Sequence, residues 1–182
     1  MAVPSPQTWP AGSFVDDADL NREVRDAIDF LLAPPRCYAY KSGNGALATG
    51  TWDAINFDSE AYDSHNAHDP TTNNSRISAP EAGLYTIAAA VEFDANATGS
   101  RRVQIRKNAN ATQTSGTLLR SVTVNAVAGA GNPTTIQITF DAQLSAADYV
   151  ELFAQQTSGG PLNVLGTIAG LYMSIRWCAK TA

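Results

Sequence analysis

From residue 37 to the end, short stretches of alternating residues separated by turns restrict the fold more than any other feature. In Thr134–Leu144, Ile136, Ile138 and Phe140 occupy one face, and threonine and glutamine occupy the other. This is the two-residue period of a half-buried strand. Strands are predicted at Arg36–Tyr40, Thr51–Asn56, Gly83–Phe93, Arg101–Lys107, Thr117–Asn125, Thr134–Leu144, Tyr149–Gln156 and Leu171–Ala179. With no helix between them, they predict an all-β antiparallel sandwich or jelly roll over residues 36–182.

Residues 1–35 have a different pattern and are predicted to form an attachment or trimerisation element. Residues 1–13 contain three prolines around Trp9 and predict an extended arm. A helix is predicted from about Asp17 to Leu32, because an apolar stripe recurs there at spacings of three and four. The stripe consists of Leu20, Val24, Ala27, Ile28 and Leu31. Its partner is either the parent domain or a symmetry mate or larger assembly, and the sequence favours neither.

Charge and composition exclude several classes of protein. The net charge is -5, whereas a nucleic-acid binder carries a clustered basic excess. No apolar run approaches the roughly 18 residues of a membrane-spanning helix, and the first residues lack the features of a secretory signal. Two cysteines exclude a disulfide framework and a four-thiolate zinc site. A disulfide between Cys37 and Cys178 is conceivable, although two buried free thiols are favoured.

The residues that could carry chemistry are few. His65 and His68 lie three residues apart beside carboxylates and could bind a metal, but a solvated connecting loop is the favoured interpretation. The acidic stretch 53–63 lacks the glycine-centred calcium-loop pattern. No Gly-x-Ser-x-Gly elbow occurs, and no pair of acids is singled out for glycoside hydrolysis. We therefore expect no catalytic residue, no metal and no cofactor.

A basic cluster lies in one predicted strand, at Arg101, Arg102, Arg106 and Lys107. Because neighbouring strand residues point to opposite faces, these side chains do not form a single patch. Protection of a sheet edge, or contact with an acidic neighbour, is the expected use.

Three short motifs resemble the C1q/tumour-necrosis-factor-like jelly roll. The run ISAPEAGLYTI at 77–87, followed by Ala88–Phe93, is similar to one strand of that family. Asp148–Leu152 resembles a later strand, and Leu171–Ala179 fits the closing strand. The resemblance covers about residues 37–182 and implies a jelly-roll fold. That family is usually homotrimeric.

The N-terminal part resembles the leader of many tailed-bacteriophage virion proteins. The similar segments are TWPAGSFV at 8–15, DLNREVRD at 19–26 and FLLAPP at 30–35. The resemblance implies a structural virion protein, assembled in the host cytoplasm, in which the leader docks or trimerises. The docking residues would be Trp9, Phe14, Leu20, Val24, Ile28 and Leu31.

Three functions are therefore weighed. The first is a non-enzymatic homotrimer on the virion surface, a capsid decoration or head-fibre protein whose partners are itself and other capsid or tail proteins. The second is a tail-tip or minor tail protein that recognises a host-surface glycan or protein. Loops 61–75, 94–100 and 155–167 would then carry recognition, with contacts from Tyr62, His65 and His68. A carbohydrate-active enzyme is the weakest alternative.

Overall fold

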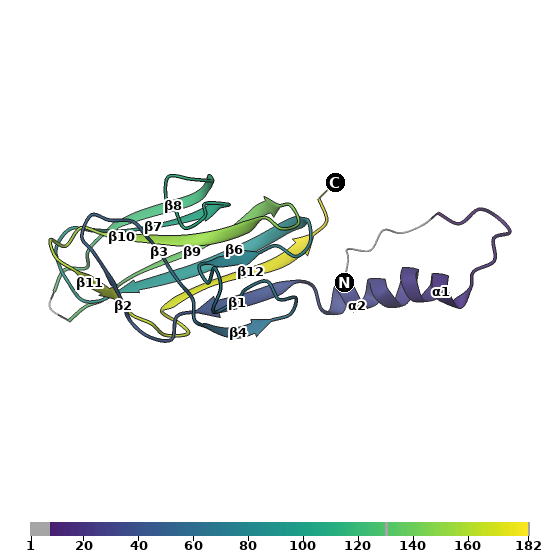
Figure 1. The fold of residues 1–182 in the computed structure, drawn as a ribbon, viewed down its shortest axis with the longest axis horizontal. Coiled ribbons are helices and arrows are strands. Elements are labelled where there is room, and N and C mark those ends of the chain that lie inside the picture. The colour runs from purple at the N-terminus through teal and green to yellow at the C-terminus, as the bar shows by residue number, and fades with distance from the viewer. Residues whose placement is uncertain (1–7, 130, 182) are drawn as a thin grey trace.

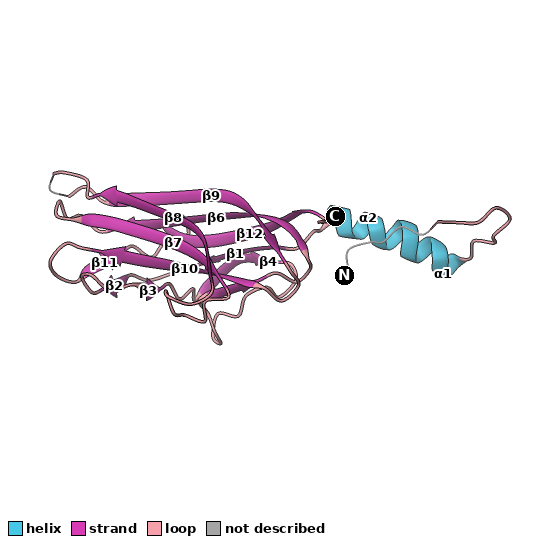
Figure 2. Ribbon diagram, turned by 90° about the horizontal axis from the view of Figure 1, so that it is seen from above, coloured by secondary structure: helices cyan, strands magenta, loops and turns pink. Residues whose placement is uncertain are grey.

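The computed structural model describes residues 8–129 and 131–181, and it shows a two-sheet sandwich with a helix projecting from one end (Figures 1 and 2). The N-terminal helix comprises α1 (Asp17–Leu20), a π-helical segment η1 (Asn21–Arg25) and α2 (Asp26–Leu32). The strands follow in the order β1 (Arg36–Tyr40), β2 (Gly45–Leu47), β3 (Asp53–Ala54), β4 (Ser59–Asp63), β5 (Arg76–Ser78), β6 (Gly83–Phe93), β7 (Ser100–Lys107), β8 (Thr117–Asn125), β9 (Thr134–Leu144), β10 (Tyr149–Gln156), β11 (Leu162–Val164) and β12 (Leu171–Ala179).

The described strands form two antiparallel sheets. The larger sheet has the order β2-β11-β6-β12-β1-β4, with β9 paired to β6 along its whole length. The smaller sheet has the order β3-β10-β7-β8, with β5 paired to β10. The first and last long strands, β1 and β12, pair side by side from Arg36↔Arg176 to Tyr40↔Tyr172. The predicted all-β antiparallel sandwich is confirmed.

The core lies between the sheets and follows from the alternation of the long strands. Every second residue of β6 from Tyr85 to Phe93 is buried, and Met173 and Ile175 of β12 face the same interior. Burying such apolar side chains removes their surface from water and is the main force that holds two sheets together. Tyr85 also ties down the chain before its strand, because its hydroxyl donates a hydrogen bond to Glu81 O at 2.7 Å.

Helix and sandwich meet at one aromatic contact. Phe30, in the last turn of α2, is 1% exposed and lies edge-on to Trp177 of β12, with ring centroids 4.8 Å apart. The backbone supports the contact, because Trp177 N donates to Pro35 O at 2.8 Å. The helix is therefore fixed at its C-terminal end and extends away from the sandwich along the long axis of the molecule (Figure 1).

The strand registers define two ends of the sandwich. Gly83 begins β6 beside Leu144, and Leu84 pairs with Ala179, so the start of β6 lies near Trp177 at the helix end. Phe93 closes β6 at the opposite end, where it pairs with Thr134 and Val164. Loop 94–100 and the loops on either side of β11, within residues 157–170, therefore lie at the end far from the helix. We call the two ends the helix end and the far end.

Several sequence predictions need correction. The strand predicted over Thr51–Asn56 is reduced to the two residues of β3, and the short strands β2, β4, β5 and β11 were not predicted. The arm predicted over residues 1–13 contains a turn, closed by Ser13 N donating to Pro10 O at 3.1 Å. Its residues 1–7, with Pro4 and Pro6, lie outside the described part of the chain.

The two cysteines also differ from the favoured interpretation. Both are free thiols, but only Cys37 is buried, whereas Cys178 is exposed. Burial raises the pKa of the Cys37 thiol well above its usual range. Cys37 therefore behaves as a core residue.

The sequence predicted that the basic cluster protects a sheet edge or contacts an acidic neighbour, and for Arg101 this prediction is wrong. Its side chain is fully buried, and the guanidinium donates to Asn96 O at 2.7 Å and to Thr98 O at 3.0 Å. Burial lowers its pKa. Arg101 thus holds the backbone of loop 94–100 at the far end, whereas Arg102 is exposed, so the two side chains do not form one patch.

No helix in residues 8–129 or 131–181 is long and apolar enough to cross a membrane.

Gly83 gives a test of the contact between helix and sandwich. A Cβ at this position would lie 2.2 Å from Trp177 Nε1 and 2.6 Å from Ala179 O. Gly83→Ala must therefore displace the ring that covers Phe30 and weaken the bond from Trp177 Nε1 to Ala82 O. We expect a loss of about 1–3 kcal/mol in the free energy of unfolding, measured by denaturant titration. Gly160→Ala is the control, because nothing lies within 4 Å of its added Cβ. Equal stability of the two variants would contradict the close approach at Gly83.

Candidate functional site

The apolar stripe of the helix is uncovered over its length. Its members Leu20, Val24, Ile28 and Leu31 are 53%, 49%, 49% and 71% exposed. We call these four residues the helix stripe. Ahead of the helix, Phe14 is 98% exposed and Trp9 is partly buried. The structure therefore places the predicted docking residues on one projecting element, although it does not test their role.

The helix has a capped N-terminus, and most of its charged side chains form ion pairs with one another. Asp16 caps the N-terminus by accepting a hydrogen bond from Asp19 N at 2.8 Å. Arg22 pairs with Asp19 at 2.7 Å, and Arg25 pairs with Asp26 at 2.9 Å. What the helix offers to a partner is therefore mainly its apolar stripe.

The π-helical segment in the middle of the helix bears on the alignment of that stripe. Asp26 N donates to Asn21 O, a bond across five residues that widens the turn. In a regular α-helix, side chains four residues apart are offset by about 40° around the helix axis, so a row with this spacing winds around the helix. A wider turn rotates the chain by a smaller angle per residue about the helix axis. It therefore reduces the angular offset between Leu20, Val24 and Ile28. The nearly equal exposure of these three side chains agrees with a straight row.

A second surface lies on the outer face of the larger sheet, where three tyrosines gather. Tyr38 of β1 stacks on Tyr172 of β12 with centroids 4.6 Å apart, and Tyr62 of β4 lies 5.9 Å from Tyr38. The Tyr38 hydroxyl donates to Ile168 O at 2.5 Å. Tyr62 is therefore part of this tyrosine group and does not stand in one cluster with the two histidines.

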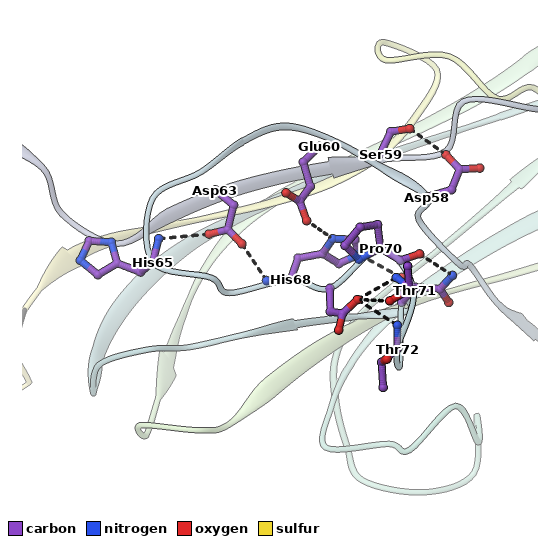
Figure 3. A network of polar contacts seen from close by, with 11 residues as sticks. Asp58, Ser59, Glu60, Asp63, His65, His68, Pro70, Thr71 and Thr72 are labelled. Carbon is purple, nitrogen blue, oxygen red and sulfur yellow. Dashed lines mark hydrogen bonds and ion pairs between the residues drawn. The ribbon is translucent and has the colours of Figure 1, made fainter.

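The loop after β4 is organised by Asp63, whose carboxylate accepts hydrogen bonds from two backbone amides (Figure 3). Its Oδ1 accepts from His65 N at 3.2 Å and its Oδ2 from His68 N at 2.9 Å. Figure 3 shows the two imidazole rings on either side of Asp63, with His65 pointing away from His68. The His-x-x-His spacing therefore does not bring the two rings together.

His68 is a structural residue in this loop. It is 7% exposed, its Nδ1 lies 2.8 Å from Glu60 Oε1, and its Nε2 lies 3.1 Å from Asn74 O. Both ring nitrogens thus face oxygen atoms of the protein, Nδ1 the Glu60 carboxylate and Nε2 the Asn74 carbonyl. Neither ring nitrogen is left for an external ligand. A recognition role stays a prediction for Tyr62 and His65, which are more exposed.

An open polar hollow of about 640 Å³ lies beside this loop. Its lining includes Glu60, Asp63, Asp69, Arg76 and Tyr149. Asp69 closes the tip of the loop by accepting bonds from Thr71 Oγ1 and from the amides of Thr71 and Thr72, which lower its pKa to about 2. Arg76 lies over the Tyr149 ring at 4.4 Å. Asp69 is therefore held within its own loop and Arg76 contacts Tyr149, so both side chains have structural roles in the wall of the hollow.

Sequence reasoning missed a buried carboxylate on β10. Glu151 is fully buried and accepts bonds from Ser75 Oγ at 2.7 Å and Ala111 N at 3.0 Å, with Arg76 Nε at 3.4 Å. A buried carboxylate held in this way joins segments that are distant in sequence to the sheet. Both faces of β10 are buried, and alternation along a single strand does not show this.

The acids near β4 have structural partners. Asp58 accepts from Ser42 N at 2.8 Å and Ser59 Oγ at 3.1 Å, and Glu60 pairs with His68. Within residues 8–129 and 131–181, no three His, Cys, Asp or Glu side chains gather closely enough to hold a metal ion.

Comparison with known proteins shows the fold. No protein-family profile matches the sequence, and no curated protein matches it by sequence. Among solved structures, Eiger TNF from S. frugiperda is 11% identical with a TM-score of 0.60, and the match covers 81% of this chain and 96% of that one. Murine APRIL is 8% identical with a TM-score of 0.57, covering 79% and 98%. The globular domain of zebrafish complement 1qA is 9% identical with a TM-score of 0.54, covering 81% and 99%.

These similarities confirm the predicted C1q/TNF-like jelly roll. At such low identity they establish the fold of the β region and leave its function to be argued from the chain itself.

Tyr38 provides a pH test of the tyrosine group. Burial raises its pKa from 10.0 to about 12. The folded state therefore favours the neutral hydroxyl, and this stabilisation is complete below pH 10 and is lost as the pH rises towards about 12. Tyrosinate absorbance of the wild type minus that of Tyr38→Phe should titrate with a midpoint near 12. A midpoint near 10, the value of a free tyrosine, would contradict the burial of this hydroxyl.

Proposed function

We propose that this chain is a non-enzymatic structural protein of a tailed-bacteriophage virion, displayed on the particle surface as a homotrimer. In this proposal, residues 1–35 dock the protein as a capsid decoration or head fibre, and the jelly roll is presented outward. The observation that carries the proposal is the exposed helix stripe on a helix that projects from one end of the sandwich. The leader resemblance at residues 8–35 supports a virion, and assembly would take place in the host cytoplasm.

The proposed mechanism is the burial of apolar surface at interfaces between proteins. Phe14, Leu20 and Leu31 expose side chains that a soluble monomer gains nothing by presenting to water. Covering the helix stripe, Trp9 and Phe14 at such interfaces would join the copies to one another and hold them on a larger body. The usual trimeric state of the family that residues 37–182 resemble supports a homotrimer.

The two ends of the sandwich support a display role. Docking residues lie at the helix end, and loops 94–100 and 157–170 lie at the opposite end. A particle bound to the helix would leave those far-end loops in solvent.

A second candidate is the tail-tip or receptor-binding module, and the exposed far-end loops favour it. Residues 97–99 and 167–169 are exposed there. The loop that contains His65, which was predicted to share in recognition, begins at the helix end, because Asp63 pairs with Cys37. Under this candidate, recognition of a host-surface glycan or protein falls to loops 94–100 and 157–170. Binding of the protein to host envelopes that is lost with Ile168→Asp would favour it over decoration.

Removal of residues 1–29 tests the docking role while keeping Phe30 on Trp177. We expect the truncated protein to remain folded by circular dichroism, because the core lies between the two sheets. Its incorporation into particles, measured by immunoblot of purified virions, should fall to background. Ile168→Asp changes a 51% exposed side chain at the far end and is the matched control, expected to be incorporated normally. Normal incorporation of the truncated protein would refute docking through this segment.

A further inference from the structure

The helix stripe has no partner within the described chain, although the helix needs one. An isolated helix of about this length is marginal in water, and most helices are stabilised by packing of their apolar face. Here only Phe30, at the last turn, is buried. The helix points along the long axis of the molecule, away from the sandwich, so Leu20, Val24 and Ile28 do not lie on its own β domain (Figures 1 and 2).

The partner must offer an apolar surface and must not need free charged groups on the helix to pair with. Arg22 and Arg25 already pair with Asp19 and Asp26 on the same helix. These exposed pairs are worth little to a partner, and a strongly charged partner would have to break them. A second copy of the helix meets both requirements. It offers the same apolar stripe, and its charged side chains are already paired on its own surface.

The geometry of the stripe suits copies that lie parallel. When identical helices pack side by side in register, Leu20, Val24 and Ile28 of one copy meet the same residues of the next copy. A straight row is needed for this contact to continue along the helix, and the π-helical segment supplies it. Three copies arranged around one axis form a closed ring, in which each stripe is covered from two sides.

The surface continues at the base of the helix. A small hollow of about 280 Å³ is lined by Leu31, Pro34, Arg176, Trp177 and Cys178. Leu31 belongs to both the helix stripe and this hollow, so the apolar surface runs from the helix onto the edge of the sandwich. A neighbouring helix end would extend the packing there beyond the four stripe residues.

From these contacts we propose that the partner of the helix stripe is the same stripe on two further copies of this chain, which together form a parallel three-helix neck. Trp9 and Phe14, ahead of the helix, then remain to contact the particle. The proposal rests on the homotrimer of the proposed function and divides residues 1–35 into a self-association part and a particle-binding part.

Val24→Glu and Asn21→Glu in the full-length protein form a matched pair. Both place the same side chain at exposed positions three residues apart, but only Val24 belongs to the stripe. By light scattering, the wild type and Asn21→Glu should have three times the 19.2 kDa chain mass. Val24→Glu should fall to the mass of one chain, because three carboxylates cannot be buried together at the axis. A trimeric Val24→Glu, or a monomeric wild type, would overturn the proposal.

Disulfide trapping measures the proximity directly. In a Cys178→Ser background, which removes the exposed native thiol, Val24→Cys should form a covalent pair of chains under mild oxidation. Such a bond requires Cα atoms within about 7 Å, which a parallel neck provides at Val24. Asn21→Cys, which is exposed but lies outside the stripe, should stay monomeric on a non-reducing gel. Equal cross-linking of both variants, or none of Val24→Cys, would contradict the neck.

Particle incorporation separates this inference from the proposed function. If Val24→Glu stays trimeric and is lost from particles, the stripe binds the particle and the neck is wrong while docking stands. If the wild type is trimeric through the stripe but never enters virions, the neck stands and the proposed function fails.

Discussion

The edge-on contact between Phe30 and Trp177 determines how the whole molecule can be used. It anchors the helix at its last turn and leaves the preceding turns without support from the same chain. Gly83 makes the contact possible, because any side chain there would occupy the space of the Trp177 indole. A helix held by one end presents its apolar side chains to other molecules, whereas a helix folded back on the sandwich would have hidden them in the core.

The elements that the sequence predicted well are those whose own residues carry enough periodic signal. β6, β8, β9, β10 and β12 match the predicted bounds, as does the helix between Asp17 and Leu32. The missed strands are short, from three to five residues, and they form because another part of the folded chain supplies their hydrogen bonds. Periodicity over so few residues does not separate a strand from a turn. β11, for example, pairs mainly with the equally short β2, a contact that only the folded chain brings together.

The candidate site shows the same division. The stripe followed from residue spacing, but Phe30 lies off that stripe and was not singled out, although an aromatic residue near the end of a helix is a reasonable signal for a tertiary contact. His68 was expected on a surface, yet Glu60, eight residues earlier, and Asn74 enclose it. Sequence alternation cannot reveal such enclosure, because it depends on how an irregular loop folds over its neighbours. Glu151 is buried for a similar reason, since Ser75 and the amide of Ala111 cover it from distant segments.

The separation of the two ends has a consequence for how such a protein can evolve and be altered. The far-end loops are held by local devices, such as the buried Arg101 that binds the carbonyls of loop 94–100. The helix end is held by Phe30, Trp177 and Gly83, and the two groups share no residue. Substitutions that are distant and without common partners act nearly independently on stability. The far-end loops can therefore change their sequence while the helix and its stripe keep their geometry, as the proposed attachment at one end and display at the other would require.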